Sequence, residues 1–209
     1  MIQARKTTTA QVMVHKAREK KPEAPTKELP REYQRHWKVF SKKLAQRFPP
    51  KRWEDMAIEL LLGAPTSINC KIYPLNSKET KILKEFLEEE EKKGYITPGS
   101  SPYTAPVFFV GKKDSQELRP VMDYWELNKW TKRDNNPLPN IKIILENLRG
   151  GELFSKFDLQ WGYKNLRIKP EDREKAAFKT IFGTFIPNVT YFGLTNAPPT
   201  FQRVVHLDL

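Results

Sequence analysis

The chain has few of the residues that form disulfides or thiolate metal sites. Its 209 residues include one cysteine, Cys70, which has no internal disulfide partner and cannot by itself build a thiolate zinc centre. The three histidines, His15, His36 and His206, do not have the spacing of a zinc motif. These absences exclude disulfide-stabilised small domains and the common zinc-binding modules.

Long apolar runs and acidic residues are also scarce. No stretch approaches the roughly 20 apolar residues of a membrane-spanning helix, and the N-terminus lacks the apolar stretch of a signal peptide. Asp and Glu number 25 against 37 Lys and Arg, which gives a net charge of +12 at pH 7. We therefore expect a soluble intracellular chain, cytoplasmic or nuclear, without a membrane partner. The charge suits a phosphate-rich partner, although a merely soluble basic protein would show the same balance.

The N-terminal part predicts an arm followed by one helix. Residues 1–29 are polar and carry too few apolar side chains to bury themselves, which predicts a disordered arm or linker. Over Pro30–Phe48, five apolar side chains recur at helical spacing and predict a helix with one packing face. They are Tyr33, Trp37, Phe40, Leu44 and Phe48. Trp53–Leu62 is either an edge strand or a connecting segment, so residues 30–76 are predicted to form a helix and a connection.

Ser77–Gly94 has the clearest helical pattern of the chain. Ser77 is the expected cap, and Gly94 suits the position after the last turn. The acidic run Glu88–Glu91 can form i,i+4 pairs with Lys92 and Lys93, so it predicts a solvated face without chemistry.

Pro106–Lys112 and Glu117–Asp123 read as two strands joined by a polar loop, which predicts a hairpin. Lys112, Lys113 and Arg119 lie around its tip. Such cations suit a polyphosphate, and an ordinary solvated loop explains them equally well.

Leu153–Leu159 is rich in branched and aromatic residues and predicts a short, mostly buried strand with Asp158 at its end. A carboxylate there is a metal ligand or a backbone cap. The remaining patterns predict an amphipathic helix before Gly150, a helical turn, two short strands and a final helix. The last four cover Pro170–Lys175, Ala177–Thr180, Thr184–Val189 and the segment from Ala197 onward.

Six segments of the chain resemble a reverse transcriptase in their order and spacing. They are SSPYTAPVFFVGKKD, LRPVMDYWELNKWT, NNPLP, FSKFDLQWGYKNLRI, KAAFKT and FGLTNAPPTFQ. The closest likeness is to the pol polyprotein of gypsy-type LTR retrotransposons, and RWEDMAIEL resembles its segment between protease and polymerase. The resemblance covers about residues 30 to 204. It implies an α+β fold with an extended N-terminal arm, fingers over residues 77–150 and an incomplete palm over residues 151–209.

The resemblance also implies a metal site. Asp158 matches the first catalytic aspartate of the family, and the Leu159 carbonyl matches a further ligand. Carboxylate and carbonyl oxygens suit Mg²⁺, with Mn²⁺ as an alternative, and paired ions can stabilise attacking and leaving oxygens. The family's second motif, Tyr-x-Asp-Asp, is absent from the sequence, and Asp208 lies too close to Phe201 to replace it. The metal site is therefore expected to be incomplete in this chain.

Nucleotide and nucleic-acid contacts follow from the same resemblance. Lys112 and Arg119 match residues that hold the triphosphate, and Tyr163 matches the aromatic ring beneath the sugar, which leaves no room for a 2′-hydroxyl. Phe192 matches a residue that lines the nucleotide pocket. Three residues match the start of a helix beside the template–primer: Pro198, Phe201 and Gln202. Two departures, Trp161 and Thr190-Tyr191, fall near this pocket.

The implied function is RNA-directed DNA polymerisation by nucleotidyl transfer to a primer 3′-hydroxyl, inactive in this chain alone. The implied partners are an RNA template, a DNA primer, deoxynucleoside triphosphates and the rest of a pol polyprotein. Two alternatives stay open. One is a catalytically dead nucleic-acid-binding module, and the other is a structural or interaction protein derived from a retroelement.

Overall fold

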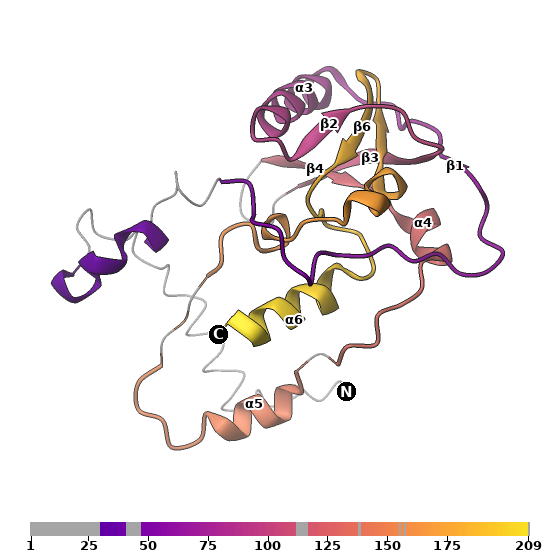
Figure 1. Ribbon diagram of the computed structural model, residues 1–209. Coiled ribbons are helices and arrows are strands. Elements are labelled where there is room, and N and C mark those ends of the chain that lie inside the picture. The colour runs from indigo at the N-terminus through magenta and orange to yellow at the C-terminus, as the bar shows by residue number, and fades with distance from the viewer. Residues whose placement is uncertain are drawn as a thin grey trace, which may run out of the picture. The chain divides into compact units, whose positions relative to one another are not determined.

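The computed structural model describes residues 30–40, 47–111, 117–137, 139–154, 156 and 158–208 (Figure 1). The predicted arm, residues 1–29, and the hairpin tip with Lys112 and Lys113 lie outside the described residues. The chain divides into two units, residues 1–45 and residues 46–209, which we describe separately. In the described part of the chain, no helix combines the length and apolarity needed to cross a membrane.

The first unit contains one helical element, η1 (Arg31–Phe40). It is a 3-10 helix interrupted at His36, where φ is −104° and ψ is 15°. Tyr33, Trp37 and Phe40 are about half exposed, and the rings of Tyr33 and Phe40 meet edge to face at 6.4 Å. The predicted helix is thus confirmed as far as Phe40, but its aromatic face is not buried within the described unit. Residues 41–46 lie outside the description, and Phe48 belongs to the second unit in an irregular segment.

The second unit is built on a six-stranded mixed sheet (Figure 1). Its strands run in the order β1 (Ile68–Asn69), β3 (Tyr103–Gly111), β5 (Phe178–Thr180), β6 (Gly183–Pro187) and β2 (Ile96–Pro98), with β4 (Leu118–Met122) paired to β3. β3 is parallel to β1 and β5 and antiparallel to β4. The two predicted strand pairs, β3–β4 and β5–β6, are both confirmed. Together with its helices, the sheet gives the mixed α and β composition that the sequence predicted.

Helix α3 (Ser77–Lys92) packs against β2 and β4 through a face that includes the buried Leu83 and Leu87. Its cap is Asn76, one residue before the predicted Ser77. The Asn76 side-chain oxygen accepts a hydrogen bond from the Glu79 N–H at 2.9 Å, and the Glu79 carboxylate accepts one from the Asn76 N–H at 2.9 Å. This reciprocal capping box satisfies two backbone donors that a helix start leaves unpaired. Gly94 adopts a φ of +72° after the last turn, as predicted.

The segment from Trp53 to Leu62 is a connection that contributes to the core. Met56 and Ile58 are each 1% exposed, and only isolated bridges join the segment to Ile168 and Thr131. Side chains replace strand pairing at Ile58. The Asp172 carboxylate accepts a hydrogen bond from its N–H at 2.9 Å, and the Lys175 ammonium donates one to its carbonyl at 2.8 Å.

The other helical elements follow the predicted order. They are α4 (Trp125–Trp130), α5 (Ile141–Asn147), η2 (Gly162–Asn165), η3 (Pro170–Ala176) and α6 (Ala197–Asp208). Asn140 caps α5, whose residues are all exposed. The predicted amphipathic helix is therefore present, and no described element covers its apolar side.

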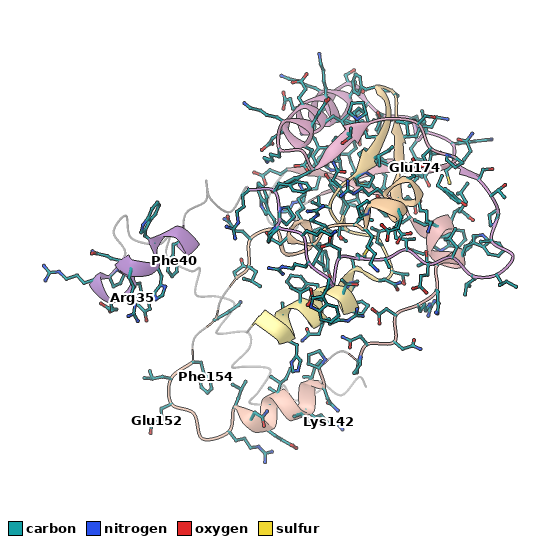
Figure 2. All side chains as sticks on the ribbon, in the orientation of Figure 1. Arg35, Phe40, Lys142, Glu152, Phe154 and Glu174 are labelled. Carbon is teal, nitrogen blue, oxygen red and sulfur yellow. The ribbon has the colours of Figure 1, made fainter. Side chains whose placement is uncertain are left out.

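The predicted buried strand Leu153–Leu159 is wrong for the described residues of that segment. Leu153, Phe154 and Leu159 are 94%, 63% and 54% exposed and lie in irregular structure. Figure 2 shows the side chains of Phe154 and Glu152, which are both exposed. A strand needs a partner for its backbone N–H and C=O groups, and no described strand pairs with this segment.

Candidate functional site

The site begins where the irregular segment turns into η2. Trp161 occupies the left-handed region with a φ of 56° and a ψ of 41°, which is unusual for a bulky residue. The Asn165 side chain donates to the Gln160 carbonyl at 3.1 Å and to the Trp161 carbonyl at 3.4 Å, which closes the turn. Gly162 and Tyr163 then form the first residues of η2.

Three aromatic rings from two segments of the sequence meet at η2. The ring of Tyr163 packs edge to face on Phe192 at 4.9 Å and 74°, and on Phe201 at 5.6 Å and 83°. Gly162 permits this approach, because a Cβ atom there would lie 3.0 Å from the Phe201 ring. We call Tyr163, Phe192 and Phe201 the aromatic triad. All three were predicted site residues, and the structure brings them together.

Two hydrogen bonds from a side chain of helix α4 hold the turn that carries Phe192. The Asn128 side chain donates to the Gly193 carbonyl at 2.6 Å and accepts from the Thr195 N–H at 3.0 Å. Gly193 has a φ of 104°, and a Cβ atom there would lie 2.9 Å from the Met122 carbonyl oxygen. Only a glycine fits this turn without strain.

A second asparagine holds the start of α6 in the same manner. The Asn196 side chain donates to the Lys132 carbonyl at 2.9 Å and accepts from the Asp134 N–H at 3.0 Å. Arg203 forms an ion pair with the Asp134 carboxylate. The sequence pattern did not single out Asn128, although it lies inside a segment that carried the family resemblance.

A polar network around Glu90 joins the residues that neighbour Tyr163 and Phe192 in the sequence. Glu90 is 2% exposed, and its Oε2 atom accepts hydrogen bonds from the Tyr191 hydroxyl and the Lys164 ammonium, both at 2.6 Å. The Lys93 ammonium lies 3.9 Å from the other carboxylate oxygen. The prediction of a solvated acidic face is therefore wrong at Glu90. It is confirmed at Glu89, whose carboxylate is exposed and pairs with Lys93 at 2.5 Å.

Aromatic rings surround the Lys164 ammonium. Its nitrogen lies 5.3 to 5.6 Å from the ring centroids of Trp161, Tyr191, Phe86 and Tyr95. Burial lowers the pKa of Lys164, while the nearby Glu90 carboxylate opposes that shift. Burial, followed by the same carboxylate, raises the pKa of Tyr191 well above its ordinary value. Trp161 and Tyr191, which lie in the two departures Trp161 and Thr190-Tyr191, thus both place their rings near the partly buried Lys164 ammonium.

The remaining predicted residues lie outside the triad. Arg119 lies exposed on β4 opposite Val110 of β3. Pro198 is exposed in the first turn of α6, and Gln202 is partly buried in the same helix. Lys112 lies outside the described residues, so its geometry relative to Arg119 stays a prediction.

The predicted metal ligands lie in the irregular segment. Asp158 and Leu159 are both exposed. Within the described ranges, no three His, Cys, Asp or Glu side chains gather where they could share a metal ion. The Asp158 carboxylate and the Leu159 carbonyl are oxygen ligands of the type that Mg²⁺ prefers, but they do not complete a site. The described residues alone therefore do not fit a two-metal centre.

A separate cleft of about 370 Å³ lies between the connecting segment, residues 132–135 and α6. Two ion pairs lie on its wall: the Lys132 ammonium is 3.1 Å from the Glu59 carboxylate, and Arg203 pairs with Asp134. None of the predicted site residues lines it.

Comparison with known proteins gives one family match. The family described as "Reverse transcriptase (RNA-dependent DNA polymerase)" matches residues 110–207. The chain is 32% identical over 151 residues to the "Retrovirus-related Pol polyprotein from transposon opus" of Drosophila melanogaster, covering 70% of this chain and 15% of that protein. It is 34% identical over 137 residues to the "Transposon Tf2-3 polyprotein" of Schizosaccharomyces pombe, covering 66% of this chain and 10% of that protein. The chain thus spans between a tenth and a sixth of the length of these relatives.

Proposed function

Residues 110–207 of this chain are derived from a reverse transcriptase, and from that premise we propose that the chain receives the incoming deoxynucleotide in such an enzyme. In this proposal, residues 77–150 form the fingers and residues 151–209 form part of the palm. The reaction served is nucleotidyl transfer to a primer 3′-hydroxyl on an RNA template. The rest of a pol polyprotein is the proposed partner, which accords with the polyprotein relatives.

The aromatic triad carries this proposal. Tyr163, Phe192 and Phe201 come from two segments of the sequence and converge within ring-contact distance. Phe192 is 67% exposed, so the cluster offers an accessible apolar surface. A sugar resting on the Tyr163 ring would have its 2′ position against the aromatic edge, where a hydroxyl would be excluded.

The polar end of the nucleotide is assigned to the hairpin. Arg119 is exposed on β4, and a guanidinium can contact phosphate oxygens through two parallel hydrogen bonds. Lys112 is proposed to add a second positive charge at the same hairpin. α6 contributes Phe201 to the triad and also carries Pro198 and Gln202, and we propose that these three residues of α6 contact the template–primer.

Divalent ions belong to the chemistry of the reverse transcriptase family. In this chain, Asp158 and the Leu159 carbonyl are the groups we propose would contribute to holding Mg²⁺ or Mn²⁺. Because the described residues do not complete the site, the role argued for this chain is to bind and orient the nucleotide.

The test is discrimination between two nucleotides that differ only in the 2′-hydroxyl. Binding of dGTP and GTP to the chain on an RNA template with a DNA primer can be measured by calorimetry. We expect dGTP to bind more tightly, and Tyr163→Ala to reduce that preference on the order of tenfold. Tyr73→Ala is the matched control, because Tyr73 is exposed and lies outside the triad. An unchanged preference in Tyr163→Ala would contradict the assignment of the sugar site.

A second candidate is nucleic-acid binding without catalysis. It is favoured by the net charge of +12 together with the absence of a metal-binding cluster from the described residues. This alternative predicts that affinity for single-stranded RNA falls steeply as salt rises, because Lys and Arg side chains that neutralise phosphates release the counterions condensed on the RNA. It also predicts no preference for dGTP over GTP, which separates it from the first proposal.

A further inference from the structure

The Glu90 carboxylate joins two segments that each carry a member of the aromatic triad. One hydrogen bond to it comes from Lys164, the residue directly after Tyr163. The other comes from Tyr191, the residue directly before Phe192. The end of α3 is thereby tied at one atom to both segments.

The burial of the Glu90 carboxylate restricts where its two hydrogen-bond donors can lie. A carboxylate that is 2% exposed has lost its water and depends on the protein for hydrogen bonds. Hydrogen bonds to an ionised group are short and directional, so both donors are constrained in position. The four rings around the Lys164 ammonium leave its side chain little freedom to seek another partner.

Trp161, the residue directly before η2, lies near the same lysine. Its ring lies 4.5 Å from the Lys93 ammonium and 5.3 Å from the Lys164 ammonium, close enough for cation–π attraction. Its left-handed backbone sets the direction in which η2 leaves the irregular segment. Trp161 and Lys164 therefore act on the same short stretch of backbone, and Tyr191 is joined to it through Glu90.

We propose that Glu90, Lys164 and Tyr191 form a positioning network that fixes the Tyr163 and Phe192 rings and thereby sets how strictly the site excludes a 2′-hydroxyl. The inference rests on the proposed function. The three residues are positioning residues, because none belongs to the triad. Lys164 and Tyr191 act on it through the adjacent backbone, and Glu90 acts through its hydrogen bonds to both. Buried hydrogen bonds of this kind restrict the positions that the Tyr163 and Phe192 rings can take.

A purely stabilising role makes a different prediction. Buried ion pairs contribute little net stability in many proteins, and their loss is felt chiefly through the partner left unpaired. If the network only stabilised the fold, its variants would lower the resistance to unfolding without altering the geometry of the triad.

The experiment compares Glu90→Gln and Tyr191→Phe with a matched control, Asp172→Asn. Asp172 is also a buried acid paired with a lysine, at 2.5 Å from Lys175, but its partners lie at Ile58 and not at the triad. Three quantities are measured on the full chain: urea unfolding, the ring-proton resonances of Tyr163, and the ratio of dGTP to GTP affinity. The resonances report the two facing rings and need no nucleotide.

We expect Glu90→Gln and Tyr191→Phe to shift the Tyr163 resonances and to reduce the affinity ratio about fivefold. Tyr191→Phe keeps its ring and serves as the test should Glu90→Gln fail to fold. Asp172→Asn should lower stability and leave both other readouts unchanged. Unshifted Tyr163 resonances in folded network variants would overturn the inference. Wild-type chain that binds neither nucleotide would refute the proposed function, and the resonances would still decide the positioning role.

Discussion

Gly162 shows how one atom controls the aromatic triad. An added Cβ would lie 3.0 and 3.2 Å from two atoms of the Phe201 ring, so the ring must move by a few tenths of an ångström. We expect Gly162→Ala to lower the free energy of unfolding by about 1–3 kcal/mol through this overpacking. Gly111→Ala is the control, because nothing lies within 4 Å of its Cβ position and its φ is not left-handed. Equal unfolding curves for the two variants would contradict the packing described at Gly162.

Tyr191 gives the chain a measurable response to alkaline pH. Burial and the Glu90 carboxylate raise its pKa well above the ordinary value of 10.0. The folded state therefore keeps this proton at pH values where the unfolded state has lost it. The resulting stability is fully present below pH 10.0 and is lost as pH rises further toward the folded pKa.

Tyr191→Phe removes this titrating group. We expect the variant to lose less stability than wild type between pH 9 and 11, the range around the ordinary tyrosine pKa. Urea unfolding at a series of pH values measures the effect. Tyr33→Phe, at an exposed tyrosine of the first unit, is the control and should follow the wild type. A parallel pH dependence of Tyr191→Phe and wild type would contradict the assigned burial.

Among single residues, local pattern and family resemblance were enough to predict the aromatic triad but not the partners of Glu90. The triad residues each belong to a segment that resembles the family, and they meet in the structure. Glu90 was misread because helical spacing reveals only neighbours three or four positions away. Its actual partners, Lys164 and Tyr191, lie 74 and 101 positions along the chain. No pattern local to the acidic run contains that information.

Among the elements, α3 provides a test of capping. The sequence pattern favoured Ser77 as the cap, whereas the structure assigns the reciprocal hydrogen bonds to Asn76. We expect Asn76→Ala to reduce the free energy of unfolding by about 0.5–2 kcal/mol, because the Glu79 N–H loses its side-chain acceptor. Ser77→Ala should be nearly neutral, since serine at the first helical position makes no capping bond there. Thermal unfolding of the two variants distinguishes the assignments, and a larger loss for Ser77→Ala would reverse them.

Elements that pair with a sequence neighbour were the predictable ones. The β3–β4 and β5–β6 pairs are each joined by a short connection, so their strand and turn signals lie close together. Leu153–Leu159 has comparable strand propensity, yet its described residues form no strand. Propensity describes how well side chains fit a pleated surface, and it cannot supply the neighbouring strand that the backbone requires. β1 was not predicted from the sequence. It has only two residues and is defined by its pairing with β3, not by a strand pattern of its own.

For the whole molecule, the decisive question is whether this chain polymerises DNA. Two-metal phosphoryl transfer requires several fixed anionic oxygens to hold both ions against the triphosphate. Among the described residues, the predicted ligands Asp158 and Leu159 are exposed, and no acidic cluster completes the site. We therefore expect no Mg²⁺- or Mn²⁺-dependent primer extension by the purified chain on an RNA template.

The matched experiment supplies what the sequence lacks. We propose a chimera that continues this chain through a Tyr-x-Asp-Asp hairpin and thumb from a related transposon polyprotein. It should gain primer extension, because the two aspartates of the added motif would then face Asp158. Asp158→Asn in that chimera should abolish extension, while Asp134→Asn, which removes a carboxylate paired with Arg203, should leave extension detectable. Extension by the unmodified chain would show that its own residues complete the metal site. Extension by the Asp158→Asn chimera would show that the metal ions bind elsewhere.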